Sequence, residues 1–187
     1  MRLVPIIASV FAVCSAAAWA ANPQVEIKTS MGTMTAELYA DKAPKTVGNF
    51  LEYVKSGYFN GTIFHRVIPG FMIQGGGFTK DMNEKPTRPP LQHEGAACGT
   101  NESGTLAMAR TGDPHSATAQ FFVNVANNDR LNYTLPPQGW GYCAFGKVTR
   151  GMDIAQKIVA VPTKASGGHQ NVPIDPITIE SITLVSK

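Results

Sequence analysis

Residues 64–79 read FHRVIPGFMIQGGGFT. Two strand-like halves flank Pro69-Gly70, and such a dipeptide is a strong signal for chain reversal. If the strands pair about Gly70, Arg66 lies across from Gln74, so a guanidinium and a carboxamide share one face of the sheet. The apolar side chains around this pair are Phe64, Ile68 and Met72. A fixed cation and an amide among apolar groups suit a neutral, partly apolar ligand and do not suit a phosphate or a metal ion.

The composition of the whole chain is that of an ordinary soluble protein. Its 187 residues are 43% hydrophobic and 16% charged, which predicts one main domain. The basic residues are scattered, without the cluster typical of a nucleic-acid face, so we expect no nucleic-acid partner. The histidines lack metal-ligand spacing, so we expect no metal site. They are His65, His93, His115 and His169.

The first 20 residues differ from the rest of the chain. Arg2 supplies a minimal positive start, residues 6–18 are apolar, and Ala18-Trp19-Ala20 offers a cleavage site with small residues. This pattern predicts a secretory signal peptide over residues 1–20, and a single domain over residues 21–187 without stable membrane association. An uncleaved anchor is the alternative, because no charge interrupts residues 3–21.

Alternation of apolar and polar residues predicts many short strands. Residues 25–28 and 33–38 form an opening hairpin around Met31-Gly32. Further strands are expected near residues 105–109, 121–125 and 143–148. The last strand contains Ile177 and Ile179, and its parity slips before Ile182, which indicates a β-bulge.

Two helices are predicted among these strands. The first begins at Pro44, which suits a first turn, and ends at Gly57. Its buried stripe has helical spacing and consists of Val47, Phe50, Leu51 and Val54. The second helix covers residues 152–159. Residues 80–103 are polar and rich in Pro and Gly, and we expect a long surface loop there. Many short strands with turn signals favour a closed antiparallel barrel.

Two further blocks carry a family resemblance together with residues 64–79. They are LAMAR at 106–110 with QFFVNV at 120–125, and FGKV at 145–148 with GMD at 151–153. From about residue 25 to residue 185 the chain resembles the cyclophilins, the cyclosporin-sensitive peptidyl-prolyl cis-trans isomerases. The resemblance implies a mainly β fold, namely a closed eight-stranded antiparallel β-barrel capped by two α-helices. It also implies an isomerase without a cofactor.

Rotation about an X–Pro bond is slow because amide resonance creates a barrier of about 18–20 kcal/mol. In the twisted transition state the proline nitrogen becomes pyramidal and regains its lone pair. A donor aimed at that nitrogen therefore stabilises the transition state more than the ground state. Arg66, which stays charged at any relevant pH, is the predicted donor, and the resemblance implies the same role. The alternative for Arg66 is a surface ion pair.

Gln74 is the second predicted catalytic residue, and its amide would hold the carbonyl side of the substrate. The resemblance implies a proline-ring pocket and an edge that pairs with the peptide main chain. His65 is expected to pack or to contact substrate, since isomerisation transfers no proton. The predicted substrate-binding residues are His65, Ile68, Phe71, Met72, Ala109, Arg110, Thr111, Gln120, Phe122, Leu131 and Tyr142. Apolar members of this set would otherwise be ordinary core residues.

The chain departs from the family pattern at several positions. Arg130 stands where cyclophilins that bind cyclosporin tightly carry tryptophan, so we expect weak cyclosporin binding. Trp140 is the nearby residue that could compensate. Tyr142 replaces a frequent histidine, Arg110-Thr111 replaces Asn-Ala, and Gly77 replaces an aspartate. With the leader, these changes resemble the periplasmic bacterial subgroup and imply a monomer that acts on proline-containing peptides and unfolded exported proteins in the periplasm.

Cys98 and Cys143 remain after removal of the leader. They could pair in an exported protein, but spacing does not reveal the distance between them, and free, partly buried thiols are the expectation. Two other functions stay open. One is a chaperone that binds proline-containing segments, with isomerisation incidental. The other is a hollow small-ligand barrel, although Phe64, Ile73, Phe121 and Val123 are expected to fill its interior.

Overall fold

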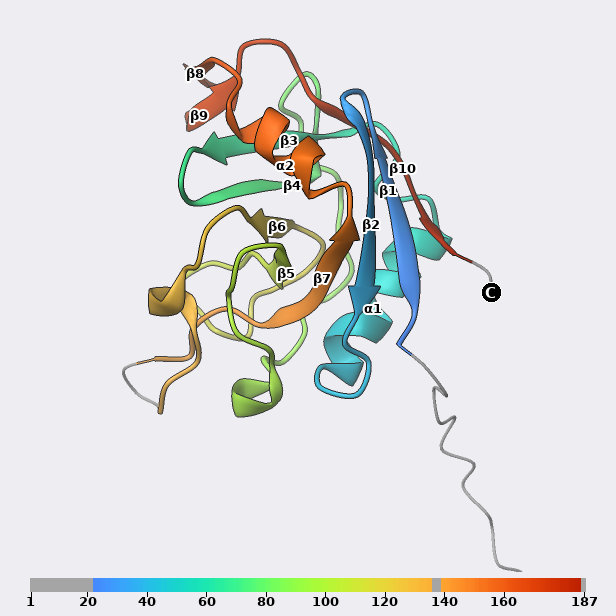
Figure 1. The fold of residues 1–187 in the computed structure, drawn as a ribbon, viewed down its shortest axis with the longest axis vertical. Helices are drawn as coiled ribbons and strands as arrows, with labels where there is room; N and C mark the ends of the chain where they lie inside the picture. The colour runs from blue at the N-terminus through green and yellow to red at the C-terminus, as the bar shows by residue number, and fades with distance from the viewer. Residues whose placement is uncertain (1–21, 136–138, 186–187) are drawn as a thin grey trace, which may run out of the picture.

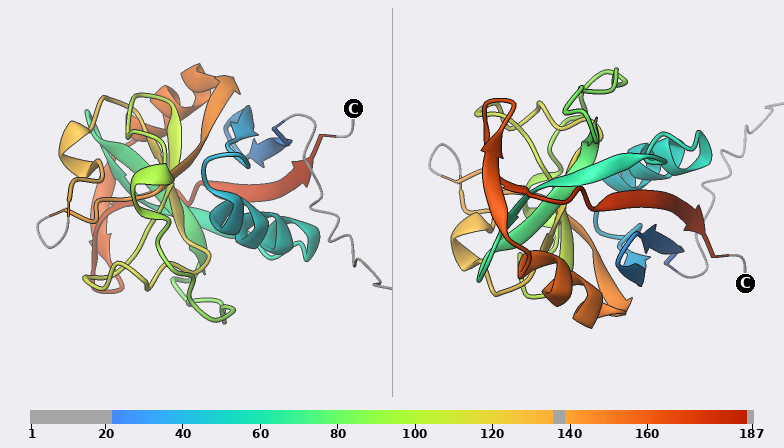
Figure 2. Two further views of the ribbon diagram at one scale, coloured as in Figure 1. Left: turned by 90° about the horizontal axis from the view of Figure 1, so that it is seen from below. Right: turned by 90° about the horizontal axis from the view of Figure 1, so that it is seen from above.

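The chain folds into a closed barrel in a computed structural model that describes residues 22–135 and 139–185. The barrel strands are β1 (Gln24–Thr29), β2 (Gly32–Leu38), β3 (Thr62–Ile68), β4 (Met72–Thr79), β5 (Thr105–Met108), β6 (Phe121–Asn124), β7 (Ala144–Arg150) and β10 (Thr178–Leu184). They are ordered β1-β10-β3-β4-β6-β5-β7-β2, and every neighbouring pair is antiparallel (Figure 1). The C-terminal strand β10 closes the barrel between β1 and β3 (Figure 2). The predicted eight-stranded barrel is confirmed.

Two α-helices cap the barrel, at its lower and upper ends in Figure 1. Helix α1 (Pro44–Lys55) begins at the predicted proline and buries the predicted stripe, and α2 (Met152–Val159) has the predicted bounds. Helix α1 ends two residues before Gly57, which has a φ of +65°. Within the described residues no helix is long and apolar enough to cross a bilayer. The leader expected at residues 1–20 lies outside the described residues.

The hairpin of β3 and β4 has the predicted register. Arg66 lies opposite Gln74, and Ile68 lies opposite Met72. The turn places Gly70 at a φ of +69°, a conformation that glycine adopts without a steric penalty. A β-bulge also occurs where parity slips in β10, because Lys28 pairs with Ser181 whereas Thr29 pairs with Ile179. These local expectations are confirmed.

A small hairpin beside β3 was not predicted. It consists of β8 (Thr163–Ser166) and β9 (His169–Pro173), joined by Gly167 and Gly168, which both have positive φ. Its first strand is mostly exposed and has no alternation of apolar and polar residues. Sequence periodicity therefore misses it, although the Gly-Gly pair is a turn signal.

Aromatic rings fill the barrel interior. The rings of Phe50, Phe59 and Phe121 pack against one another with centroids 5.1–5.6 Å apart. The four residues expected to fill the interior, Phe64, Ile73, Phe121 and Val123, are fully buried. A barrel packed in this way leaves no room for the hollow of a small-ligand barrel.

The segment of residues 80–103 is the expected irregular loop, and it is tied to the barrel at several points. It contains the short 3-10 helix η1 (Gly95–Ala97). Upstream of that helix, the Glu94 carboxylate accepts hydrogen bonds from the backbone N–H groups of Lys45 and Thr46 at 3.0 and 2.9 Å. These are the unpaired donors at the start of α1, where a negative charge is favoured. A residue far away in sequence therefore caps the helix.

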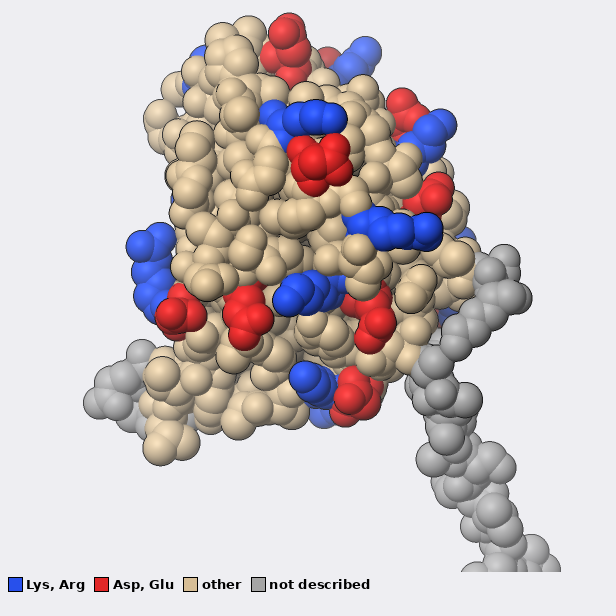
Figure 3. All heavy atoms as spheres, viewed as in Figure 1, with Lys and Arg blue, Asp and Glu red and all other residues tan. Residues whose placement is uncertain are grey.

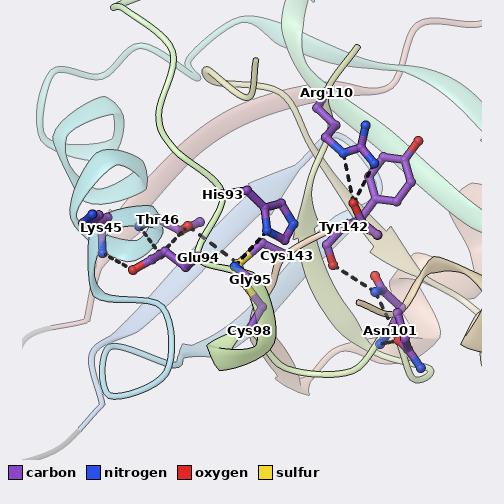
Figure 4. The surroundings of a disulfide bond; sticks show 12 residues. Lys45, Thr46, His93, Glu94, Gly95, Cys98, Asn101, Arg110, Tyr142 and Cys143 are labelled. Atoms are coloured by element: carbon purple, nitrogen blue, oxygen red, sulfur yellow. Dashed lines mark hydrogen bonds between the residues drawn. A yellow bond between two sulfur atoms is a disulfide. The ribbon is translucent and has the colours of Figure 1, made fainter. Parts of the chain in front are cut away.

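Cys98 and Cys143 form a disulfide, so the expectation of free thiols is wrong (Figure 4). Gly99 donates its N–H to the carbonyl of Ala144 at 2.9 Å, and this bridge aligns the loop with the start of β7. The two cysteine Cα atoms consequently lie 5.0 Å apart, within the range that a disulfide spans. This closeness depends on pairing between distant segments, which cysteine spacing does not reveal.

Charged side chains are intermixed on the face of the molecule in Figure 3. Lys and Arg alternate with Asp and Glu there, and no area of one sign dominates that face. Several opposite charges form exposed ion pairs, including Lys157 with Asp153 at 3.2 Å and Lys28 with Glu180 at 3.0 Å. Exposed pairs of this kind contribute little to stability.

Candidate active site

A pocket of about 340 Å³ opens beside strands β3, β4 and β6. It is also lined by the segment after β5, by the short 3-10 helix η2 (Asp129–Leu131), and by the approach to β7. The residues that line it are His65, Arg66, Phe71, Met72, Gln74, Phe78, Ala109, Arg110, Gln120, Phe122, Leu131, Tyr142 and His169. The structure therefore brings together the predicted site residues from five separate parts of the chain, with two exceptions.

Ile68 and Thr111 are the two predicted residues that do not line this pocket. Ile68 packs beneath it, against the buried cluster that contains Met72 and Phe122. Thr111 lines an adjoining hollow of about 180 Å³, together with Glu84 and other polar residues. The two hollows share Gln74, Ala109, Arg110 and Gln120.

The floor of the pocket is apolar and separate from the main core. Met72 and Phe122 are buried there with Ala107 and Ala144, and the partly exposed Phe71, Leu131 and Tyr142 pack around them. Phe122 and Tyr142 meet edge to face, with ring centroids 5.6 Å apart. This arrangement can accept a small apolar ring and remove it from water.

A row of polar side chains forms one rim of the pocket. Arg66 Nη1 donates to Gln74 Oε1 at 3.3 Å, and Gln74 Nε2 donates to Gln120 Oε1 at 3.1 Å. Gln74 pairs across the sheet with Arg66 on β3 and with Phe122 on β6, so the row follows the strand register. Arg66 forms no ion pair with any acidic side chain of the described residues. Its guanidinium is therefore oriented by a neutral amide and has no direct carboxylate partner in the described part of the chain.

Arg110 is engaged differently from Arg66. Its Nε and Nη2 atoms both donate to the carbonyl of Gly141, at 2.9 and 2.8 Å, and its guanidinium lies 4.5 Å from the centre of the Tyr142 ring. The neighbouring Ala109 already donates its N–H to the Gln120 carbonyl at 2.9 Å. Arg110 therefore holds the Tyr142 wall in place. Because the Ala109 N–H is already paired, a peptide at this edge would have to bond to main-chain groups other than that N–H.

His65, Phe78 and His169 form an aromatic side wall. The His65 ring meets Phe78 at 4.7 Å and His169 at 5.7 Å, both edge to face. The sequence interpretation missed Phe78 and His169. Phe78 has the same strand parity as Gln74, and this signal could have identified it. His169 lies on the unpredicted hairpin, and nothing near it in sequence indicates a site.

Burial lowers the pKa of His65 from 6.5 to about 4, and electrostatic interactions with the neighbouring His169 and with the Arg66 guanidinium add to this effect. Its Nδ1 atom is buried without a hydrogen-bond partner among the described residues. The imidazole is consequently neutral at neutral pH. A packing or contact role fits this state better than acid–base chemistry.

His65 leads to a prediction about the pH dependence of stability. Between pH 6.5 and about 4, the unfolded chain binds a proton on this residue and the folded chain does not. The free energy of unfolding should therefore decrease as the pH falls through this window, by up to about 3 kcal/mol. Urea unfolding at pH 7 and pH 4.5 measures this loss. The His65→Gln variant, which cannot titrate there, should lose less, and equal losses in the two proteins would contradict the prediction.

Arg130 and Trp140 make different contacts around the pocket. The Arg130 guanidinium lies 4.9 Å from the centre of the Phe71 ring, so a cation covers this pocket residue. Trp140 packs against His93 and His115, with ring centroids 5.6 and 4.9 Å apart, and does not line the pocket. Trp140 therefore contributes no ring to this pocket.

The part of the chain that the structure describes contains no group of three or more His, Cys, Asp or Glu side chains that could hold a metal ion. The polar rim of the pocket presents a fixed guanidinium and two carboxamides above an apolar floor. Such a set can bind and polarise an amide, and it contains no activated nucleophile.

Comparison with known proteins identifies the family. The sequence model described as "Cyclophilin type peptidyl-prolyl cis-trans isomerase/CLD" matches residues 24–184. A peptidyl-prolyl cis-trans isomerase of Streptomyces antibioticus is 56% identical over 162 residues, which cover 86% of this chain and 98% of the relative. Peptidyl-prolyl cis-trans isomerase B of Escherichia coli K12 is 53% identical over 161 residues, with the same shares of the two chains.

A solved structure agrees with these relatives. The crystal structure of a cyclophilin-type isomerase from Cryptosporidium parvum matches with a TM-score of 0.70 and 29% identity, over 89% of this chain and 99% of that one. The chain belongs to the cyclophilin-type peptidyl-prolyl cis-trans isomerases. Its activity is therefore the cis-trans isomerisation of peptide bonds that precede proline.

Proposed function

We propose that the pocket receives the proline ring and that Arg66 donates a hydrogen bond to the proline nitrogen as the X–Pro bond twists. The observation that carries this proposal is the guanidinium of Arg66, which forms no ion pair among the described residues and is held by Gln74 at the rim of an apolar pocket. The ring would lie on the floor formed by Met72, Phe122 and their neighbours. A matching structure of the Cryptosporidium parvum protein was solved in the presence of the dipeptide Ala-Pro, which supports a ligand of this size.

The energetics of this mechanism are modest. To bring the uncatalysed step of tens to hundreds of seconds to milliseconds requires about 10⁴- to 10⁵-fold acceleration, or about 5.5–7 kcal/mol. One hydrogen bond from a charged donor supplies about 1.5–3 kcal/mol of this. The remainder would come from removal of the bond from water and from a fixed peptide geometry, to which Gln74 and Gln120 contribute.

We also propose that the natural substrates are exported proteins in the periplasm. The leader pattern of residues 1–20 supports export. The disulfide between Cys98 and Cys143 supports it further, because disulfides persist in oxidising compartments and are rare in the cytosol. Amino-terminal sequencing of the protein from a periplasmic extract should begin after Ala20. Recovery of the intact chain in the membrane fraction would instead support an uncleaved anchor.

An experiment on refolding separates catalysis from chaperone action. A client whose slow phase is X–Pro isomerisation should refold faster with sub-stoichiometric enzyme, since each enzyme molecule turns over many times. A matched substrate protein without a proline-limited phase should refold at the same rate with and without the enzyme. A chaperone that only binds proline-containing segments would require stoichiometric amounts and would change yield more than rate. That outcome would overturn the proposed role in folding.

Cyclosporin should inhibit this enzyme only weakly. The pocket has Arg130 over Phe71 in place of an indole, so a flat apolar face and an N–H donor are missing at this position. Titration of the isomerisation of an Ala-Pro peptide with cyclosporin tests this expectation. Inhibition as strong as that of a cyclophilin with the tryptophan would show that Arg130 does not limit binding.

A further inference from the structure

Three buried asparagines are connected to the main chain of pocket residues. Asn101, Asn124 and Asn128 are 0%, 0% and 5% exposed, and none of them lines the pocket. Their carboxamides form a chain, because Asn124 donates to Asn101 Oδ1 at 3.2 Å and Asn128 donates to Asn124 Oδ1 at 2.6 Å. Buried amides linked in this way have fixed orientations, since a rotation of any one would leave several groups unpaired.

Asn101 connects this chain of amides to two walls of the pocket. Its Nδ2 donates to the carbonyl of Leu131 and to the carbonyl of Tyr142, both at 3.0 Å (Figure 4 shows the bond to Tyr142). Tyr142 in turn donates its N–H to the Leu131 carbonyl at 2.8 Å. The main chains of these two pocket residues are therefore joined to each other and to one buried side chain.

Asn128 makes the equivalent connection on the other side of the pocket. Its Nδ2 donates to the carbonyl of Phe71 at 2.9 Å. Its main-chain N–H donates to the Asn101 carbonyl at 2.8 Å, so the two asparagines are also joined through the backbone. Phe71, Leu131 and Tyr142 thus lie on segments distant in sequence and share one set of buried amide donors.

The segment that carries Asn101 is itself firmly held. Cys98 bonds to Cys143, the residue after Tyr142, and Gly99 donates to Ala144. The main-chain N–H of Asn101 donates to Asn132 Oδ1 at 2.6 Å. The position of the Asn101 amide is therefore determined by covalent and hydrogen-bonded neighbours on both sides. A side chain fixed in this way can hold the two pocket walls at a constant distance through its hydrogen bonds to their carbonyl groups.

We propose that Asn101 is a positioning residue for the isomerase, which sets the spacing of Leu131 and Tyr142 around the proline ring through their carbonyl groups. This inference rests on the proposed function, since it takes the pocket to be the site of the proline ring. Asn101 touches no substrate. Its effect on the reaction passes through the two walls, so it should change how well a peptide binds more than how fast the bound peptide isomerises.

Substitution of Asn101 by aspartate tests the proposal. Aspartate has the same size and still accepts from Asn124, but it replaces the donor to Leu131 and Tyr142 by an oxygen. The KM for an Ala-Pro peptide should rise about tenfold, because both pocket walls lose their hydrogen bond to Nδ2, and kcat should stay within about twofold. A purely structural role predicts the opposite split, because a smaller folded fraction lowers apparent kcat and leaves KM unchanged. That result would overturn the proposal.

The matched control is Thr29→Val. Thr29 is 4% exposed and donates to the Gly32 carbonyl at 2.7 Å, in the hairpin of β1 and β2 and outside the pocket. Its loss also removes a hydrogen bond of a buried side chain, so it destabilises the fold without altering the pocket walls. The control variant should retain the parent's KM, and a rise equal to that of Asn101→Asp would show that KM responds to any destabilisation.

A measurement on the unaltered protein keeps the proposal testable if Asn101→Asp does not fold. Saturation with an Ala-Pro peptide should shift the side-chain amide resonances of Asn101 in NMR spectra, although this amide is inaccessible to the peptide. The amide of Asn22, which bonds to Glu37 near the amino terminus of the described chain, should not move. A fixed Asn101 resonance beside shifted Tyr142 and Leu131 resonances would overturn the inference. If no pocket resonance shifted, the proposed function itself would fail.

Discussion

The Arg66→Ala variant is expected to lower kcat/KM for an Ala-Pro peptide about 10- to 100-fold. The estimate follows from the loss of one hydrogen bond from a charged donor, which is worth about 1.5–3 kcal/mol in the transition state. The peptide's affinity should change much less, because the apolar floor is intact and the proline nitrogen has no free lone pair in the ground state. The loss should therefore fall mainly on kcat.

Two further variants sharpen this test. Arg66→Lys keeps the charge but loses the planar guanidinium that Gln74 orients, so its activity should lie between those of the parent and Arg66→Ala. Arg88→Ala removes a cation that pairs with Glu52 on the surface at 3.3 Å, and it should leave kcat/KM unchanged. An Arg66→Ala enzyme that turns over like the parent would assign the catalytic donor to another group.

The second large effect is expected from loss of the disulfide. The Cys98→Ser/Cys143→Ser variant should lose about 2–4 kcal/mol in free energy of unfolding, because the bond closes a long loop with a sequence separation of 45 residues. Cys98 also lies in the irregular segment of residues 80–103, which carries the Glu94 cap of α1 and the buried Asn101, so release of this segment loosens contacts at both. Urea unfolding of the variant measures the loss.

The parent and the single variants supply the controls for this prediction. Reduction of the parent with dithiothreitol should reproduce the loss, while the reduced double variant should not change further. Each single serine variant should be about as unstable as the double variant, since either change breaks the same bond. Equal stability of the oxidised and reduced parent would show that the folded loop does not depend on the disulfide.

Much of the fold could be predicted from local sequence. The Pro-Gly turn and the alternation around it led to the pairing of Arg66 with Gln74, which the structure confirms. The start of α1 at Pro44, the bounds of α2 and the bulge in β10 follow from equally local signals. Such features depend on φ restriction and on side-chain periodicity within one element, and both are determined by residues that are close in sequence.

The candidate site was predictable in a more limited way. Periodicity alone placed Arg66 and Gln74 on one face, whereas Ala109, Phe122, Leu131 and Tyr142 entered through the family resemblance. Those residues meet only because β5 and β6 pair and β7 returns beside β5. Strand order in a barrel is a property of the whole chain, and no single segment carries it.

Three contacts could not be predicted from local sequence and were revealed only by the tertiary structure. The contact of His169 with His65, the bond between Cys98 and Cys143, and the donation from Asn101 to Tyr142 all join segments far apart in sequence. Short-range patterns specify individual strands and helices because each residue is constrained by its nearest neighbours. Distances between those elements are set only when the barrel closes and its core packs, and the pocket is assembled at that step.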